Sequence, residues 1–214
     1  MREFIVFWTV VWICAVGTQV VRADIITSAS DPALAGATVI EFESAPKGTH
    51  ASLTIGEVTF TGVDRSLRID DSYSGWYSTT GSYLDNWAYF DPGFSSMRID
   101  FAADVSAFGF NWGGADSAWS LTAYNAFGDS LGVYNLPAAV DPDPPYGGAF
   151  VGLASPGLGI DYAMLSCQAP AGAEHDWIFI DNFMYQQVVP APGAVLLGAL
   201  GLSAAGARLR RMRA

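Results

Sequence analysis

Between residues 24 and 189, short runs of alternating apolar and polar residues follow one another, separated by Gly, Pro, Asp and Ser. Successive side chains of a β-strand point to opposite faces of a sheet, so this alternation predicts strands with one buried face. No segment of 10–12 residues shows the 3.6-residue period of an amphipathic helix. Short strands at this spacing predict an all-β fold, a single β-sandwich or jelly roll over residues 24–187. The expected strands are 38–42, 57–61, 87–90, 96–101, 105–112, 119–125, 131–135, 149–153, 160–166 and 177–185, the last with an irregularity at Asp181 and Asn182.

Charge divides the chain into three parts. The whole chain has 10 Lys and Arg against 21 Asp and Glu, but six of the ten cations lie near the two ends. Between Asp24 and Val189, four cations face 20 carboxylates, a net charge of −16. A domain this acidic lacks the basic face that phosphate binding requires, which excludes nucleic acid as a partner.

Residues 1–23 have the pattern of a secretory signal peptide. Arg2 precedes an apolar run from Phe4 to Gly17, and Ala23 ends a small-residue cleavage site in front of Asp24. We expect a signal helix that signal peptidase removes after export. The alternative is an apolar helix that stays in the membrane.

Residues 188–214 form a different terminal segment. The 15 residues 193–207 carry no charge, and we expect them to form a hydrophobic transmembrane helix that starts near Pro192. A cluster of cations follows and stays on the cytoplasmic side, which leaves the acidic domain outside. The alternatives are an ordinary tail anchor and a buried amphipathic helix, of which the absence of polar periodicity disfavours the second. The cations are Arg208, Arg210, Arg211 and Arg213.

The order of a short motif, an apolar helix and an arginine cluster resembles a PEP-CTERM protein-sorting tail. The resemblance implies a bacterium with an envelope and transient anchoring in its inner membrane. It also implies an exosortase-like enzyme that cleaves near the motif and delivers the protein to the cell surface or the extracellular space. Such proteins commonly accompany exopolysaccharide and biofilm production. The motif is Val189, Pro190, Ala191, Pro192, Gly193 and Ala194, with Ala191 where the type sequence has Glu.

The domain itself resembles jelly-roll domains of carbohydrate-binding type. The resemblance rests on VSAFGFNW (105–112), LTAYNAFGDSLG (121–132), FVGLASPGLGI (150–160) and FIDNFMY (179–185). It implies that a first strand at residues 38–42 pairs near the last strand.

Motifs of common enzymes do not occur. His50 and His175 are the only histidines, and neither lies in a HExxH or CxxC context. There is no Gly-x-Ser-x-Gly elbow. Two of the 20 carboxylates could serve glycoside hydrolysis, but their abundance points to no pair. We therefore expect a non-catalytic protein, with a polysaccharide-modifying enzyme as the lesser alternative.

One candidate site is for calcium, which prefers carboxylate and carbonyl oxygens. Glu41 and Glu43 alternate on one face of the first expected strand, and Asp181 lies on the last. If the two strands are neighbours, the three carboxylates could share a structural calcium ion. Ordinary solvated acids are the favoured alternative.

A second candidate site lies in the aromatic stretch 73–90, where rings alternate with hydroxyl, amide and carboxylate groups. Flat rings beside such groups suit the faces and hydroxyls of sugars. The candidate glycan-binding residues are Tyr73, Trp76, Tyr77 and Trp87. In the alternative, Trp87 packs into the core while Trp76 and Tyr77 merely cover a loop.

Together these features predict an exported, non-catalytic protein of the cell surface or extracellular matrix that binds glycan or exopolysaccharide. The alternative from another class is a structural matrix protein without a specific ligand.

Overall fold

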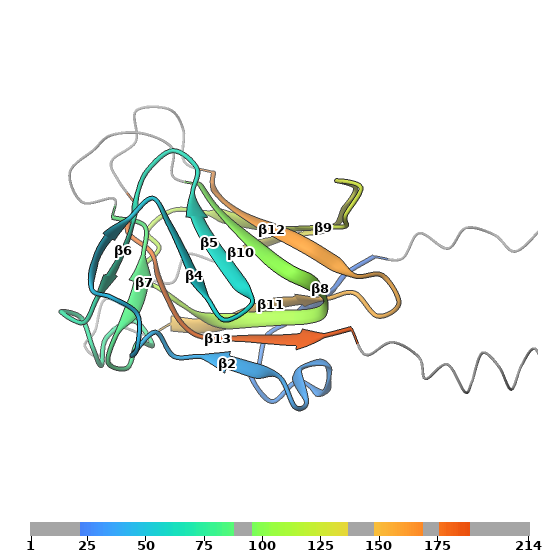
Figure 1. Ribbon diagram of the computed structural model, residues 1–214, viewed down its shortest axis with the longest axis horizontal. Helices are drawn as coiled ribbons and strands as arrows, with labels where there is room; N and C mark the ends of the chain where they lie inside the picture. Colours follow the sequence, from blue (N-terminus) through green and yellow to red (C-terminus); the bar gives the residue numbers. More distant parts are fainter. Residues whose placement is uncertain (1–21, 88–95, 137–147, 169–175, 189–214) are drawn as a thin grey trace, which may run out of the picture.

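The computed structural model describes residues 22–87, 96–136, 148–168 and 176–188, and this part of the chain is all-β (Figure 1). The expected signal helix and sorting tail lie outside these ranges, apart from residues 22, 23 and 188. Within the described ranges no helix is long and apolar enough to cross a membrane. The elements are β1 (Asp24–Ile26), η1 (Pro32–Leu34), β2 (Thr38–Ile40), β3 (Gly48–His50), β4 (Ser52–Ile55), β5 (Val58–Gly62), β6 (Leu67–Asp70), β7 (Tyr83–Asp85), β8 (Ser96–Gly113), β9 (Trp119–Tyr124), β10 (Ser130–Leu136), β11 (Gly148–Ala154), β12 (Ile160–Cys167) and β13 (Phe179–Gln187).

The long strand β8 takes part in two layers. In its first half, Ile99 lies between Ala163 of β12 and Phe60 of β5. In its second half, Trp112 lies between Ala149 of β11 and Ile180 of β13. The sequence predicts two strands here, 96–101 and 105–112, and the structure has one strand with an exposed bend at residues 102–104.

The two halves of β8 fold one continuous sheet into the two layers of a β-sandwich. The first layer has the order β10-β9-β12-β8-β5-β4 and the second β1-β11-β8-β13. Along the free side of β13 lie β2 and β7, and β7 continues to β6 and β3. The predicted all-β class is confirmed.

Aromatic rings from both layers meet in the core. The ring of Phe183 on β13 lies 5.1 Å from that of Phe60 on β5 and 5.8 Å from that of Phe110 on β8. The indoles of Trp112 on β8 and Trp119 on β9 are 5.7 Å apart. All five side chains are buried, and their tilted and stacked arrangements are those that aromatic quadrupoles favour.

The last strand has the expected irregularity. Phe179 and Ile180 pair with β7, whereas residues 183–185 pair with β2. Between them the register toward β8 shifts, and Asn182 has a φ of 47°. The expected pairing of the strand near residue 38 with the last strand is confirmed. Asp181 lies where the partner of β13 changes from β7 to β2.

The strand expected at 87–90 is wrong at its first residue. The local strand is β7, and Trp87 follows it with a φ of 46°, in the left-handed region. Residues 88–90 lie outside the described ranges. Four further strands of three or four residues each were not predicted from the sequence, namely β1, β3, β4 and β6.

Candidate functional site

The aromatic stretch gathers at one end of the sandwich, beside β6 and β7, which we call the aromatic end. Residues 71–82 connect these two strands, and Trp87 follows β7 closely. In Figure 1 this end lies at the left, whereas β13 ends at the right, at the opposite end of the sandwich and one residue before Val188. There the backbone N–H of Val188 donates to the carbonyl of Asp104 at the bend of β8.

Phe179 of β13 is the centre of a packed aromatic group. The ring of Tyr77 stacks on it at 4.9 Å, and the rings of Tyr73, Tyr83 and Trp177 lie 5.6, 5.1 and 5.1 Å away. Tyr73 and Tyr77 are therefore half-buried. Two of the four predicted glycan contacts thus serve chiefly to pack the loop against the second layer.

Glycines of β8 and the following turn allow this close packing. A Cβ at Gly113 would lie 2.2 Å from the carbonyl oxygen of Tyr77, and one at Gly114 would lie 2.4 Å from the ring of Phe179. Because neither residue has a side chain, the loop lies directly on the backbone of β8.

Two of the predicted calcium residues hold the same loop. Oδ2 of Asp181 accepts the backbone N–H of Thr80 at 2.7 Å, and Oε1 of Glu43 accepts that of Ser82 at 3.0 Å. Burial raises the pKa of Asp181 to about 6, and the charges of Glu43 and Glu41 add to the rise against the two N–H donors. The structure therefore brings Asp181 and Glu43 to the same loop, and Glu41 lies exposed in the segment after β2.

Among the described residues, no group of three or more acidic, histidine or cysteine side chains has the arrangement of a metal site. The carboxylates of Asp181 and Glu43 instead anchor backbone N–H groups between β6 and β7.

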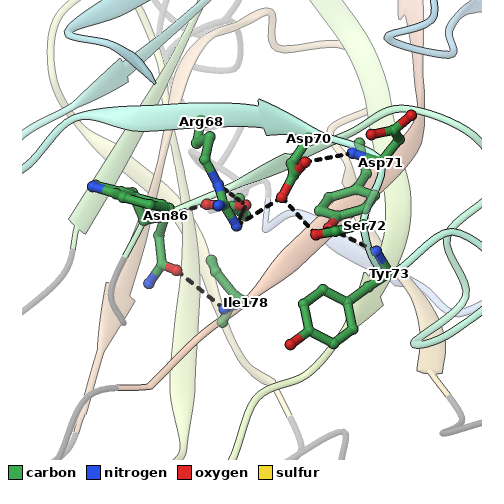
Figure 2. A network of polar contacts seen from close by, with 10 residues as sticks. Arg68, Asp70, Asp71, Ser72, Tyr73, Asn86 and Ile178 are labelled. Atoms are coloured by element: carbon green, nitrogen blue, oxygen red, sulfur yellow. Dashed lines mark hydrogen bonds and ion pairs between the residues drawn. The ribbon is translucent and has the colours of Figure 1, made fainter. Parts of the chain in front are cut away.

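A buried ion pair lies beneath the aromatic end (Figure 2). Nε of Arg68 donates to Oδ2 of Asp85 at 2.9 Å, and Nη2 lies 2.8 Å from the same oxygen and 3.1 Å from Oδ2 of Asp70. The side chain of Asp85 is fully buried. Burial raises the pKa of Asp85 above its ordinary value, although Arg68 acts against the rise.

Asp70 extends the network toward solvent. It accepts the hydroxyl of Ser72 at 2.6 Å and the backbone N–H of Asp71 at 2.9 Å (Figure 2). Burial acts to raise the pKa of Asp70, but these hydrogen bonds and the charge of Arg68 outweigh it, so the pKa lies below its ordinary value.

Trp87 rests on this network. Its backbone N–H donates to Oδ1 of Asp85 at 2.7 Å, and the guanidinium carbon of Arg68 lies 4.1 Å from its ring centre. The same guanidinium lies 5.3 Å from the ring of Trp177. Even so, 36% of Trp87 is exposed, and Trp76 is 39% exposed. These two indoles are the predicted glycan contacts that remain accessible, so Trp87 does not pack into the core.

Asn86 and Asp176 hold the segment that leads into β13. Asn86 donates through Nδ2 to the carbonyl of Asp176. Its Oδ1 accepts the N–H of Ile178 (Figure 2). The carboxylate of Asp176 accepts the backbone N–H groups of Asp116 and Ser117 and the indole N–H of Trp119. Burial raises the pKa of Asp176 above its ordinary value, although these donors oppose the rise.

A second aromatic group lies on the outer face of the first layer. The rings of Tyr124 and Tyr162 stack 4.6 Å apart, and the guanidinium of Arg98 lies 3.8 Å from the ring of Tyr162. Here ring faces are covered by one another and by Arg98. This group was not predicted from the sequence because its members come from three strands.

One further hollow, of about 320 Å³, lies between β1, η1 and the end of β11. Asp24, Asp31 and Ser106 supply its polar groups, and Ile26 and Ala154 part of its apolar wall. None of the predicted site residues lines it. The sorting motif 189–194 and the arginine cluster 208–213 lie outside the described residues.

No family model and no curated protein matches the chain. Among solved structures, it is similar to a mutant of CBM29-2, a family 29 carbohydrate binding module, with 14% identity over 80% of this chain and 99% of that one and a TM-score of 0.38. It is also similar to a GH51 α-L-arabinofuranosidase (10% identity, 75% of this chain, 28% of that one, TM-score 0.41) and to the active domain of bacteriophage CBA120 tailspike protein 4 (14%, 61%, 19%, 0.35). The chain thus spans well under a third of the last two proteins. At TM-scores below 0.5, these similarities assign neither a family nor a function.

Proposed function

We propose that this domain is a non-catalytic glycan-binding module whose binding surface is the aromatic end, with Trp87 at its centre. The observation that carries the proposal is the way Trp87 is held. A bulky residue rarely adopts a positive φ, and such strain persists only where surrounding structure enforces it, most often at functional sites. Here the fully buried Asp85 and the guanidinium of Arg68 enforce it for an indole that remains 36% exposed.

The chemistry around Trp87 suits a sugar. The C–H face of a pyranose packs on an indole, and sugar hydroxyls donate to carboxylate and hydroxyl oxygens. Asp71, Ser72 and Ser74 are exposed on the loop between β6 and β7 and supply such oxygens. A fixed ring binds with less loss of side-chain entropy than a mobile one.

The carboxylates nearest Trp87 support binding rather than hydrolysis. Glycoside hydrolysis uses one protonated and one ionised carboxyl group on opposite sides of the sugar bond. Asp70 and Asp85 both contact the same atom, Nη2 of Arg68, and the side chain of Asp85 is fully buried. Neither side chain is placed to act as such a pair.

We further propose that the protein is exported and sorted through its C-terminal segment, as the resemblance of residues 188–214 to a PEP-CTERM tail implies. The placement of the ends of the described chain supports a surface role. Residue 188 lies at the end of the sandwich opposite the aromatic end (Figure 1). If the segment after it is held at a membrane, the aromatic end points away from that membrane.

Affinity electrophoresis tests the binding function directly. The secreted protein is run through gels that each contain one soluble polysaccharide, and Trp87→Ala is compared with Phe127→Ala. Phe127 is the matched control because it is 90% exposed and lies on the turn between β9 and β10. We expect retardation of the wild type and of Phe127→Ala by at least one neutral polysaccharide. We expect Trp87→Ala to bind that polymer at least about tenfold more weakly, because stacking of a nucleic-acid base on one aromatic side chain is worth about 1–3 kcal/mol and we expect a similar value for a sugar ring. Equal retardation of the two variants would contradict the proposal.

A further inference from the structure

We infer that the aromatic end accepts uncharged glycan chains and excludes polymers of uronic acids. This inference rests on the proposed function and names the class of ligand for the same site. It concerns the charges that a bound polysaccharide meets around Trp87.

The cation beneath Trp87 is already occupied. Nε of Arg68 donates to Asp85 at 2.9 Å, and Nη2 lies within ion-pair distance of Asp85 and Asp70, at 2.8 and 3.1 Å. The faces of the guanidinium lie toward the rings of Trp87 and Trp177. Only 16% of the Arg68 side chain is exposed. A ligand carboxylate would normally be bound by a fork of arginine donors, and this fork already serves the protein's own carboxylates.

A second cation, just before β3, is also paired. Lys47 forms an ion pair with Asp71 on the loop between β6 and β7. Arg98, by contrast, belongs to the outer face of the first layer, where it pairs with Asp100 at 2.7 Å. In the network that Trp87 contacts, one cation, Arg68, therefore meets the two carboxylates of Asp70 and Asp85, and the pair of Lys47 and Asp71 adds no net charge.

This balance distinguishes between sugar classes. The oxygens of Asp71 and Ser72 accept hydrogen bonds, and neutral sugars offer hydroxyl donors at every ring position. A uronate replaces one of these donors with an anion that would have to leave water and approach an excess of negative charge. Like charges brought together in this way act as a specificity element against the wrong partner.

The test uses pairs of polymers with the same linkage and different charge. Polygalacturonate and alginate are compared with their carboxyl-reduced forms, and carboxymethylcellulose with hydroxyethylcellulose, by affinity electrophoresis of the secreted protein in low salt. We expect a retained neutral member in at least one pair, with its anionic partner bound at least about tenfold more weakly. Equal or tighter binding of the anionic member overturns the inference and leaves glycan binding standing. No retention by any neutral or anionic polymer overturns the proposed function and the inference with it.

A pair of variants separates the site from the net charge of the domain. Asp70→Asn takes one carboxylate away from Nη2 of Arg68, whereas Asp104→Asn removes the same charge at the opposite end, at the bend of β8. We expect Asp70→Asn to lower the ratio of the affinities for the neutral and the anionic polymer several-fold. We expect Asp104→Asn to leave this ratio unchanged. Thermal unfolding of both variants confirms that they are folded. An equal narrowing in both variants would attribute the preference to net charge and overturn the assignment to this site.

Discussion

The two ends of the sandwich use left-handed backbone in different ways. At the end opposite the aromatic end, the turns between β9 and β10 and between β11 and β12 place Gly128 and Gly157 at φ values of 81° and 92°. Glycine adopts this conformation without steric cost. At the aromatic end, Gly75 and Gly81 adopt it as well, but Tyr77, Ser78 and Trp87 adopt it with full side chains, at 53°, 61° and 46°. The first end is built for a tight connection, and the second holds specific side chains at a cost in backbone energy.

The side chains that accept backbone hydrogen bonds also differ between the two ends, in how deeply they are buried. In the turn between β9 and β10, Asn125 accepts the N–H groups of Phe127 and Asp129 at 3.0 and 2.9 Å, in a local motif exposed to water. At the aromatic end, Asp85 and Asp181 accept backbone N–H groups while they are buried. Buried charged acceptors are costly unless fully paired, so the aromatic end trades stability for a fixed surface. A fixed exposed indole, rather than exposure alone, therefore distinguishes the proposed binding end: Phe127 is more exposed than Trp87 and has no such support.

The largest expected effect comes from breaking the buried ion pair. Asp85→Asn leaves the guanidinium of Arg68 with Asp70 alone, and loss of one partner of a buried pair costs about 3 kcal/mol. We expect the free energy of unfolding, measured by urea denaturation, to fall by about that amount. Asp104→Asn, an exposed change at the other end, should alter it by less than about 0.5 kcal/mol. Similar losses in the two variants would remove the contrast between the ends.

Asp181 gives the next effect, through pH. Its pKa in the folded protein is raised from 3.8 to about 6, so between these values the folded state holds a proton that the unfolded state has lost. The contribution of Asp181 to stability is therefore greatest below pH 4, falls as the pH rises to about 6, and is constant above that. The total change is of the order of 2 kcal/mol.

Thermal unfolding from pH 3.5 to 7.5 measures this contribution when wild type and Asp181→Asn are compared. We expect the difference in melting temperature between the two to shift in favour of the variant as the pH rises from 4 to 6. A difference that does not vary with pH would mean that Asp181 is ionised throughout.

Repeating the series with calcium tests the metal-binding hypothesis for Glu41, Glu43 and Asp181, because a bound cation would stabilise the wild type at pH 7 more than the variant.

The fold class follows from the sequence because the core strands bury one face and alternate accordingly. The strand near Thr38 was predicted from the same alternation, and its pairing with the last strand from a family resemblance. The irregularity at Asp181 was predicted from two polar residues inside an apolar run. The strands that were not predicted are short strands, of which β3 and β4 lie at sheet edges. β3 reads GTH, which is too short and too polar to show a period, and β4 reads SLTI, whose alternation extends over only four residues. The bend of β8 read as a break because three exposed residues interrupt the alternation.

The candidate site was outlined in part by the sequence. The aromatic stretch contains most of the rings that the structure gathers at the aromatic end, but alternation in 87–90 suggested a strand, whereas Trp87 has a left-handed backbone after β7. That turn is imposed by Asp85 and Arg68, which come from two paired strands 17 residues apart, so no local pattern contains it. Trp177 and Phe179 join the group through the pairing of β13 with β7. Composition showed an excess of acids, and only the tertiary structure distinguishes the solvated carboxylates from those that hold the loop.

The smallest expected effects measure the cost of left-handed backbone at each end. Gly128→Ala should lower the free energy of unfolding by about 1 kcal/mol, because a Cβ there meets no close atom and only the φ of 81° is unfavourable. At position 87, Ala and Gly both remove the contact with Arg68, but only Gly is unstrained at a φ of 46°. We therefore expect Trp87→Gly to be more stable than Trp87→Ala by about 1 kcal/mol in urea denaturation. If the two variants unfold at the same urea concentration, Trp87 is not held in a strained conformation, and its exposure would then be no more meaningful than that of Phe127.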